Sequence, residues 1–584
     1  MHLERRFQGV AVSPGIAKGK AWVHRMDDES VPCYPLEHGT IESEIHRLEA
    51  ALLQTRSQIQ ELQQRISTSI GDENASIFDA HLLVVDDRSL IDEVMRMIKK
   101  DRLNAESVFT TVSGRYIKTL SEIDDPYLRE RAVDIHDVCR RVVRNLTGSA
   151  NRDLTTEVGG ERRILISHNL APSDTAQLNP ETVLGFATDV GSKTSHTAIM
   201  ARSLNIPAVV ALHDISLQVE TGEILLLDGY AGLIIVNPSE ATLLEYAEIE
   251  RQKGVVELEL GSLRETECKT VDGKHVVLSA NIEMPRDVAV VRHSGAEGVG
   301  LFRTEFLYLN SEALPCEQTQ YEAYRSVVSQ LAPAPVIIRT LDLGGDKIMS
   351  SLNLPQEMNP FLGWRAIRFC LERPEVFKTQ IRAILRASAH GHVRMMYPMI
   401  SGVEEVRKAN VILAECQEEL RNEGVAFDAK MQVGAMIEIP SAAISADLIA
   451  REVDFFSIGT NDLIQYTIAV DRLNERIAHL YEPTHPAILR LIRMVVEAAH
   501  TRGIWVGVCG EMAGEVTLTP LLLGLGVDEL STGAALVPRV KAAVQQLSLE
   551  ECRKLAQLTA GMDSAAAVYS ACDAVARVHY PELL

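Results

Sequence analysis

Four residues in this sequence have the types and the spacing needed to handle a phosphate group. Arg303 lies in GVGLFRTEFL and Arg339 in VIIRTLDLGGDK, and each guanidinium is a planar fork that can bind phosphate or carboxylate with two hydrogen bonds. Glu438 in GAMIEIPSA and Asp462 in SIGTNDLIQYT supply the hard oxygen ligands that suit Mg²⁺. Together these residues predict a site for a small phosphorylated carboxylate that binds with a metal ion.

Two further residues extend this predicted site. Asn461 can donate a hydrogen bond to a phosphate oxygen, and Arg472 in AVDRLNERIAHLYEP adds a third cation. A structural salt bridge is the alternative for any one arginine, because charged pairs are common. For the whole set that alternative is weaker. Mg²⁺ and the arginines would neutralise charge as a phosphoryl group departs, which predicts phosphoryl-transfer chemistry.

A reactive histidine, His196, lies in a separate motif, GSKTSHTAIMAR, at residues 191–202. The motif follows a strand-like run and opens a helix, with Thr194 or Ser195 as the expected N-cap. The positive end of a helix disfavours imidazolium and favours an anion. One histidine among 17 is usually a surface or satisfied residue. With a phosphate site elsewhere in the chain, His196 is predicted to be a neutral nucleophile that becomes phosphohistidine, and Thr175 is a weaker candidate to orient its ring.

The phosphate-site residues follow a series of candidate strands in the second half of the chain. Each strand precedes helix-like sequence, and they begin near Val276, Gly298, Val336, Val393, Val433, Phe455, Ile504 and Glu529. Eight β/α units over roughly 300 residues are typical of a TIM (β/α)8 barrel, which builds its chemistry at the C-terminal ends of the strands. Polar or reactive residues recur at those ends: Asn281, Arg303, Arg339, Glu438, Asn461, Asp462 and Cys509.

The first half of the chain predicts an α/β domain that is interrupted by a helical segment. The segment opens with a heptad-like stripe formed by Ile41, Ile45, Leu48, Leu52, Ile59, Leu62 and Ile66. Further helices are predicted over Ala75–Lys99, Ala105–Ser121 and Asp125–Leu146. We therefore predict a multidomain α/β protein. Its parts are a swivelling α/β phosphohistidine domain (1–30 and 150–237), an inserted helical subdomain (31–149), a helical linker (238–264) and the TIM barrel (265–575).

Composition narrows the possible partners and the compartment. A formal net charge of −22 provides no basic excess for neutralising nucleic acid phosphates, so no nucleic acid partner is expected. The nine cysteines form no CxxC pair and are odd in number, which argues against zinc or disulfides and for a reducing compartment. The N-terminus, MHLERRFQGVAVSPGIAKG, has no apolar signal region, and no stretch of about 18 apolar residues occurs. A cytoplasmic protein without membrane insertion is expected.

Taken in order, the motifs resemble those of Enzyme I of the phosphoenolpyruvate:sugar phosphotransferase system. They cover essentially the whole chain and include GVAVSPGIAKGKA, SIFDAHLLVVDD, LAPSDTAQL, GSKTSHTAIMARSLNIPAVV, RTLDLGGDK, NPFLGWRAIR, FFSIGTNDLIQYT and GVCGEMAG. The resemblance implies that phosphoenolpyruvate and Mg²⁺ bind on the barrel and that the phosphoryl group passes to His196. It then passes to a histidine of the carrier protein HPr, and pyruvate is released, which is the first step of that system.

The resemblance also implies a role for each matching residue. Arg303, Arg339, Asn461, Asp462 and Arg472 would bind phosphoenolpyruvate, Glu438 and Asp462 would ligate Mg²⁺, and Cys509 would donate a proton to the pyruvate enolate. Arg365, in NPFLGWRAIR, is a lesser candidate for substrate contact. The helical insert would dock HPr, and the barrels would form a homodimer. One departure is Lys193, which stands where arginine is usual and conserves charge but not fork geometry.

Because His196 must reach both the barrel and the carrier, its domain is expected to swivel on residues 238–264. Three other readings compete. Pyruvate-phosphate dikinases and phosphoenolpyruvate synthases share the histidine and the barrel but need an ATP-binding domain, for which the chain has no residues left. A regulatory paralogue from a nitrogen-linked relay typically carries an extra N-terminal sensor domain. A non-catalytic adaptor would have eroded rim residues, yet Arg303, Arg339, Glu438, Asp462 and Cys509 are all present.

Overall fold

The fold is that of a computed structural model of the chain. It describes residues 4–24, 31–37, 39–70, 77–121, 126–148, 162–170, 172–175, 178–179, 181–191, 196–204, 206–309, 314–344, 359–472, 474 and 477–584. The chain divides into two compact units, Met1–Glu250 and Arg251–Leu584. Each unit buries hydrophobic clusters of its own.

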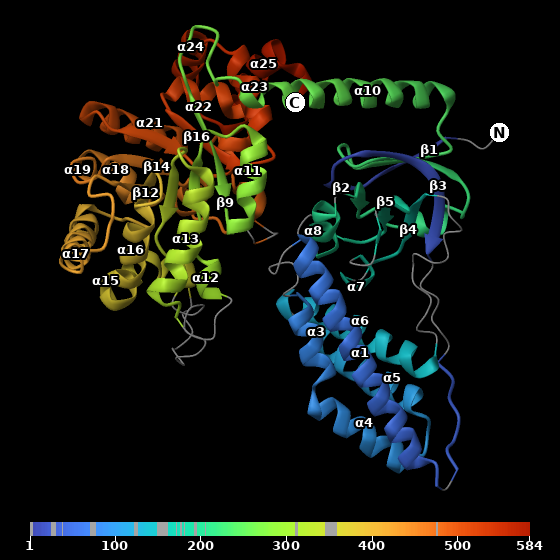
Figure 1. The fold of residues 1–584 in the computed structure, drawn as a ribbon. Helices are drawn as coiled ribbons and strands as arrows, with labels where there is room; N and C mark the ends of the chain where they lie inside the picture. Colours follow the sequence, from blue (N-terminus) through green and yellow to red (C-terminus); the bar gives the residue numbers. More distant parts are fainter. Residues whose placement is uncertain are drawn as a thin grey trace. The chain divides into compact units, whose positions relative to one another are not determined.

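The first unit is built on an eight-stranded sheet with the order β1-β8-β7-β3-β4-β5-β6-β2 (Figure 1). The strands are β1 Arg5–Gln8, β2 Val10–Ser13, β3 Ile16–His24, β4 Arg163–Ser167, β5 Val183–Thr188, β6 Ala208–Val210, β7 Ile224–Asp228 and β8 Leu233–Val236. Strand β3 pairs in parallel with β4, although residues 25–162 lie between them in the chain. The sheet therefore joins sequence from both sides of the helical segment.

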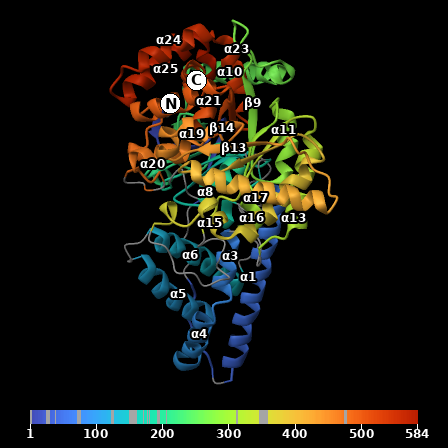
Figure 2. The same cartoon turned by 90° about the vertical axis from the view of Figure 1, so that its left-hand side faces the viewer.

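The helical insert consists of helices packed around a shared hydrophobic core, which also includes Met200. They are α1 Ile41–Ile70, α3 Ile77–Val85, α4 Arg88–Asp101, α5 Ala105–Ser121 and α6 Pro126–Thr147. Figure 2 shows α1 running along the length of the insert. Most of the predicted stripe on α1 is buried in this core, at Leu48, Leu52, Ile59, Leu62 and Ile66. Helical periodicity therefore identified the buried face of α1 correctly.

The helix predicted over Ala75–Lys99 is two helices, α3 and α4, with a break at residues 86–87. The Asp87 carboxylate accepts hydrogen bonds from the backbone N–H groups of Ser89 (2.8 Å) and Leu90 (3.2 Å). It thereby satisfies donors that the first turn of α4 leaves unpaired, as an N-cap does. The cap starts a new helix where the apolar pattern alone reads as one continuous helix.

The second unit is a closed barrel of eight parallel strands. They are β9 Val277–Ile282, β10 Val299–Phe302, β11 Val336–Arg339, β12 Val393–Tyr397, β13 Gln432–Ile437, β14 Phe455–Ile458, β15 Trp505–Val508 and β16 Glu529–Gly533. Apolar, mostly buried strands are expected here, because helices cover the outside of such a barrel and side chains fill its inside. The predicted fold class, a multidomain α/β protein with a TIM barrel, is confirmed.

Helices of very different length connect and cover the strands. They are α11 Val288–Ser294, α12 Phe306–Leu309, α13 Glu317–Leu331, α15 Ala366–Glu372, α16 Pro374–Ser388, α17 Val403–Asn422, α18 Pro440–Ile444, α19 Ala446–Ile449, α20 Thr460–Ile468, α21 Pro486–Arg502, α22 Thr519–Leu525, α23 Val537–Gln546, α24 Leu549–Thr559 and α25 Ala565–His579. The first unit adds α7 Pro172–Thr175, α8 His196–Ser203 and α9 Ile215–Gln218, and α10 Glu240–Ser262 crosses the unit boundary.

A buried lysine on α23 fixes the segment that follows α10 to the barrel. The Lys541 ammonium donates to the backbone carbonyls of Arg264 (3.0 Å), Thr266 (3.0 Å) and Gly295 (2.9 Å). Lys541 is only 2% exposed, so these three carbonyls replace the water that its charge would otherwise need. The end of the connecting segment is therefore held by a specific polar contact as well as by apolar packing.

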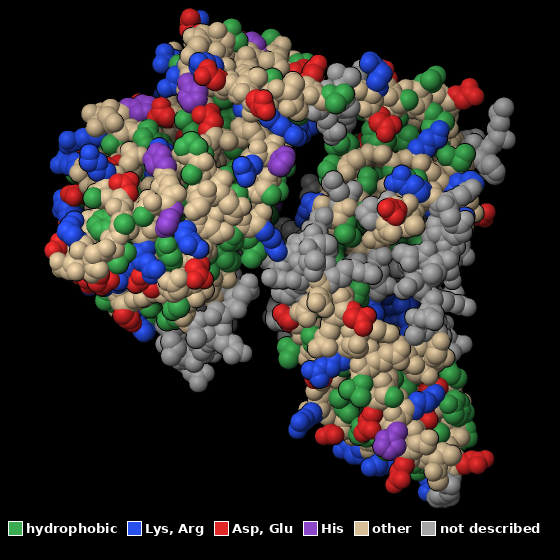
Figure 3. All heavy atoms as spheres, in the orientation of Figure 1, with side chains coloured by type: hydrophobic (Ala, Val, Ile, Leu, Met, Phe, Trp, Pro, Cys, Tyr) green, Lys and Arg blue, Asp and Glu red, His purple; other side chains and the backbone are tan. Residues whose placement is uncertain are grey.

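The surface carries both signs of charge. Lysines and arginines are interspersed with acidic side chains on the face of each unit drawn in Figure 3. None of the helices in the described part of the chain is long and apolar enough to cross a membrane.

Candidate active site at the barrel rim

The predicted site residues of the barrel lie at the C-terminal ends of its strands. Arg303 directly follows β10, Arg339 ends β11, Glu438 follows β13, Asn461 and Asp462 lie in the first turn of α20 after β14, and Cys509 follows β15. Because all the strands are parallel, these ends meet at one rim. The structure thus brings together residues that are up to 206 positions apart in the sequence (509 minus 303).

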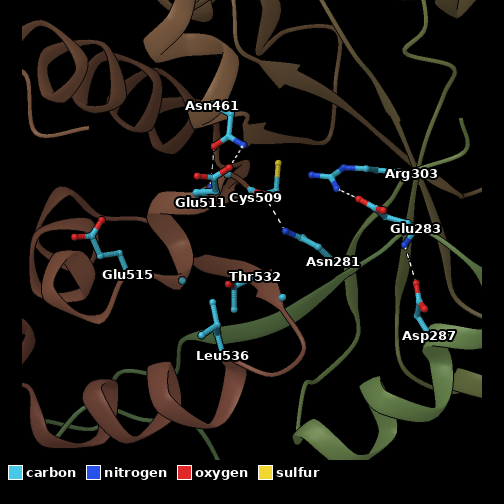
Figure 4. Close-up of a pocket in the computed structure, with 13 residues that line it drawn as sticks. Asn281, Glu283, Asp287, Arg303, Asn461, Cys509, Glu511, Glu515, Thr532 and Leu536 are labelled. Atoms are coloured by element: carbon cyan, nitrogen blue, oxygen red, sulfur yellow. Dashed lines mark hydrogen bonds and ion pairs between the residues drawn. The ribbon is translucent and has the colours of Figure 1, made fainter. Parts of the chain in front are cut away.

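A cavity of about 570 Å³ opens at this rim (Figure 4). Its lining includes Arg303, Asn461 and Cys509, together with Asn281 at the end of β9 and Thr532 in β16. A volume of this size accommodates a small metabolite.

Arg339 is the most deeply buried cation of the rim, at 8% exposure. Its guanidinium forms ion pairs with Glu305 (2.8 Å) and Asp342 (2.7 Å). Burial disfavours its charge, but the attraction of Glu305, Asp342 and Glu438 outweighs that cost and raises the pKa of Arg339. The guanidinium is thus held in a fixed orientation beside the site.

Arg365 belongs to the same network. It forms a 2.7 Å ion pair with Asp342, so this carboxylate bridges Arg339 and Arg365. The buried Gln380 side chain also ties the neighbouring strand ends together. It accepts from the Leu341 N–H (2.8 Å) and donates to the Thr304 hydroxyl (3.1 Å).

Glu438 and Asp462 are the residues for which the sequence predicts metal binding. Burial raises the pKa of Glu438 well above its ordinary value, and repulsion from Asp462 and Asp342 adds to this. Burial, followed by repulsion from Asp342, also raises the pKa of Asp462, against attraction from Arg365 and Arg339. Crowded carboxylates with this property fit a divalent cation, whose charge would relieve the repulsion.

Two glycines allow the close approach that this arrangement needs. A Cβ atom at Gly459 would lie 2.7 Å from Oε2 of Glu438, and one at Gly510 would lie 1.9 Å from the Thr460 hydroxyl oxygen. Any larger residue at either position would collide with the start of α20 or with Glu438. The glycines of SIGTND and VCGEM therefore have a packing role next to the reactive residues.

Cys509 lies in the cavity lining and is 4% exposed. Burial, reinforced by the charge of Glu438, raises the pKa of its thiol to about 11, while a hydrogen bond with Ser457 acts in the opposite direction. Asn281 donates to the Cys509 carbonyl (3.0 Å) and fixes the backbone there. Cys509 is therefore a neutral thiol at physiological pH and can donate a proton.

The remaining rim residues, Arg303, Arg472 and Asn461, are closer to solvent. Arg303 pairs with Glu283, and Arg472 pairs with Glu511 at 2.8 Å. The rim as a whole combines two buried, paired arginines, two arginines nearer to solvent, a pair of crowded carboxylates and a proton-bearing thiol. Such a site can bind a compact, highly charged anion and protonate a carbon or oxygen beside it.

His196 is the first residue of α8 and belongs to the first unit. The buried Thr197 hydroxyl donates to the Leu170 carbonyl (2.8 Å), which fixes the start of α8 against the loop after β4. Thr175 is the last residue of α7 and is fully buried. The predicted N-cap residues Thr194 and Ser195, and Lys193, lie outside the described residues.

Four acidic residues that pair with the rim arginines were not among the site residues predicted from the sequence: Glu283, Glu305, Asp342 and Glu511. A signal for them was present, because each lies within three residues of a strand end that carries a predicted site residue. Asp342 stands three residues after Arg339, and Glu511 two residues after Cys509. Acidic residues in such positions are common enough that their pairing with the arginines is visible only in the fold.

Comparison with known proteins places this arrangement in a family. The chain matches three models of phosphoenolpyruvate-utilising enzymes: the N-terminal part at residues 8–131, the mobile domain at 159–232 and the PEP-binding domain at 257–549. The mobile-domain match includes His196, and the PEP-binding match includes every rim residue described above.

Relatives match over nearly the full length. The phosphoenolpyruvate-protein phosphotransferase of Priestia megaterium is 46% identical over 548 residues, covering 94% of this chain and 95% of that protein. That of Geobacillus stearothermophilus is 45% identical over 569 residues, covering 97% of each. A solved solution structure of an Enzyme I protein is 40% identical, covers 41% of this chain and 97% of that chain, and has a TM-score of 0.34. The chain therefore belongs to the phosphoenolpyruvate–protein phosphotransferase family, the Enzyme I phosphotransferases.

Proposed function

We propose that the chain transfers the phosphoryl group of phosphoenolpyruvate to His196 and then to a histidine of the carrier protein HPr. Pyruvate is released, and the reaction is the first step of the sugar phosphotransferase system. The observation that carries this proposal is the rim itself, where anion-binding groups surround the neutral thiol of Cys509.

The charges of the rim match those of phosphoenolpyruvate. Arg303, Arg339, Arg472 and Asn461 bind the phosphate and carboxylate oxygens in this proposal, and Arg365 supports Arg339 through Asp342. The rigid pairing of Arg339 keeps a cation in place as charge moves during transfer. Preorganised charge of this kind lowers the barrier more than a flexible side chain does.

Glu438 and Asp462 would hold Mg²⁺, which neutralises phosphate charge when it is bound. The two residues come from neighbouring strand ends, so they can supply the few protein oxygens that Mg²⁺ uses beside substrate oxygens. Among the described residues there is no cluster of three or more His, Cys, Asp or Glu side chains suited to a metal. A site with two protein carboxylates fits that finding.

The transfer breaks the bond between phosphorus and the enol oxygen and forms a bond between phosphorus and a ring nitrogen of His196. The enolate left behind takes a proton on its methylene carbon from the Cys509 thiol and becomes pyruvate, and the resulting thiolate regains a proton from water before the next cycle. Backbone N–H groups at the start of α8 favour the anionic phosphate on His196. Passage of the phosphoryl group to HPr regenerates the free histidine.

The remaining parts of the proposal concern partners and compartment. The helical insert would dock HPr, and the exposed Leu53 on α1 and Leu83 on α3 offer apolar side chains for such a contact. Ile444 on α18 and Leu448 on α19 offer the same for a homodimer through the barrel. All nine cysteines are free thiols, which supports a reducing compartment and hence the cytoplasm.

The direct test is incubation of the chain with phosphoenolpyruvate labelled in its phosphate, together with Mg²⁺. We expect an acid-labile label on the protein, because the N–P bond of phosphohistidine hydrolyses in acid. The label should move to added HPr, and it should not form when EDTA removes the metal. An acid-stable label, or one that HPr does not accept, contradicts the proposed relay.

Replacing Glu438 with Gln should raise the unfolding free energy of the metal-free barrel at neutral pH, because burial raises the pKa of this carboxyl on folding. A carboxyl whose pKa is raised on folding holds its proton more tightly in the folded state. The loss of stability therefore grows as the pH rises from the ordinary carboxyl pKa to the folded pKa, and it disappears when the pH falls below the ordinary value. Glutamine resembles the protonated form. Calorimetric melting with and without Mg²⁺ measures both effects.

Mg²⁺ at about ten times its Kd should add about 1.4 kcal/mol to the wild type and nothing to Glu438→Gln. Glu529→Gln is a matched control, because Glu529 is also a buried carboxyl with its pKa raised by burial, and it lies in strand β16. That variant should keep the response to Mg²⁺. An unchanged Mg²⁺ response in Glu438→Gln would rule out Glu438 as a ligand.

A further inference from the structure

The solvent-facing anion-binding groups of the rim are already occupied by carboxylates of the chain itself. Arg303 pairs with Glu283, and Oε1 of Glu511 accepts from both Arg472 (2.8 Å) and the Asn461 amide (3.2 Å). Figure 4 shows the Asn461 amide against Glu511 on one side of Cys509 and Arg303 against Glu283 on the other. Groups that would bind substrate oxygens thus bind carboxylate oxygens instead.

These carboxylates differ from those that hold Arg339. The side chains of Glu511 and Glu283 are 75% and 48% exposed, whereas those of Glu305 and Asp342 are 13% and 4% exposed. An exposed carboxylate can rotate into water at little cost, because water replaces the lost hydrogen bonds. A buried carboxylate cannot leave its arginine without losing that compensation. Of these four carboxylates, only Glu511 and Glu283 can therefore be displaced from their arginines by a ligand.

The backbone of Glu511 has a separate function from its side chain. Its N–H donates to Oδ1 of Asn461 (2.9 Å), which sets the amide so that Nδ2 points away from that contact, toward the Glu511 carboxylate. This hydrogen bond remains when the carboxylate rotates away. Asn461 therefore stays oriented for an incoming oxygen while Oε1 of Glu511 leaves.

We infer that Glu511 and Glu283 are displaceable stand-ins for the substrate, which occupy the positions of its anionic oxygens until it binds. The inference rests on the proposed function and adds specificity-determining residues to it. A ligand must outcompete a carboxylate for the same guanidinium, so a phosphate dianion gains more than a carboxylate monoanion does. After the phosphoryl group has left, Glu511 can return to Arg472 and favour the release of pyruvate.

The test is the affinity of the full-length chain for phosphoenolpyruvate with Mg²⁺, measured by titration calorimetry. All proteins carry His196→Ala so that no transfer occurs. Removing the competing charge with Glu511→Gln should tighten binding about two- to five-fold at low salt, the range of an exposed ion pair. Glu283→Gln should act in the same direction. The gain should shrink as salt rises, because exposed pairs are screened.

Glu515→Gln is the matched control. Glu515 lines the same cavity but hydrogen-bonds Tyr569, so the variant removes one negative charge without releasing Arg472. An equal gain in Glu515→Gln would mean a general charge effect and would overturn the inference. Unchanged or weaker binding in Glu511→Gln would overturn it as well, while leaving the proposed function intact. If no variant binds phosphoenolpyruvate, both the inference and the proposed function are wrong.

Discussion

Replacing His196 with alanine is expected to remove phosphoenolpyruvate-dependent labelling of the chain, with a loss of at least about 10⁴-fold, the scale expected when a covalent nucleophile is removed. In the proposed relay no other group accepts the phosphoryl group, so nothing can substitute for the imidazole. Binding of phosphoenolpyruvate should persist, because its site lies on the barrel in the other unit. Rapid-quench labelling measures the first effect and calorimetry the second.

His168→Ala is the control for this experiment. His168 follows β4 in the same unit and pairs with Asp189 at 2.9 Å, so the variant removes a second histidine of the same domain. It should label at the wild-type rate and to the wild-type extent. Labelling that persists in His196→Ala would rule out His196 as the phosphorylated residue. An equal loss of labelling in His168→Ala would show that removing any histidine of this domain abolishes labelling.

Replacing Cys509 with alanine is expected to lower the rate of pyruvate formation by about 10²–10⁴-fold, the usual contribution of a positioned general acid. The KM for phosphoenolpyruvate should change little, because the anion-binding groups remain. The physical reason is the buried thiol, whose pKa of about 11 keeps it protonated through the working range of pH. In the proposed mechanism this thiol is the group that protonates the enolate.

Steady-state assays with saturating HPr measure this effect. Cys552→Ala serves as the control, since Cys552 is a fully buried thiol in α24 whose pKa burial raises to about 12. It tests the cost of deleting a buried sulfur atom outside the cavity, and it should retain the wild-type rate. Pyruvate formation at the wild-type rate in Cys509→Ala would exclude the thiol as the proton donor.

The fold was predictable where periodicity and burial act along a single stretch of chain. Helix α1 follows its apolar stripe, and the barrel strands are apolar runs with helices between them, as the sequence indicates. The break between α3 and α4 was not predicted, because both sides of Asp87 carry apolar residues at helical spacing. The hydrogen bonds from the backbone of α4 to the Asp87 carboxylate start a new helix there, although the apolar spacing continues across it.

The candidate site was predictable for a different reason. Arg303, Arg339, Glu438, Asp462 and Cys509 lie at or shortly after the C-terminal ends of strands, and a parallel barrel brings all these ends to one rim. The ion pairs between side chains of different loops could not be predicted from the sequence. That Asp342 bridges two arginines, or that Glu511 competes for Arg472, depends on distances between loops that no local pattern encodes.

The hydrogen bonds of Lys541, called here the Lys541 clamp, have a mechanical consequence for helix α10. Its three carbonyl contacts attach the chain just beyond this helix to the barrel, and the helix itself has 23 residues, or about 34 Å at 1.5 Å per residue. A rigid rod of that length, pinned at one end, acts as a lever. Tilting it by about 10° would move its far end through about 6 Å, so a small change of backbone angle beside the clamp is amplified along the helix.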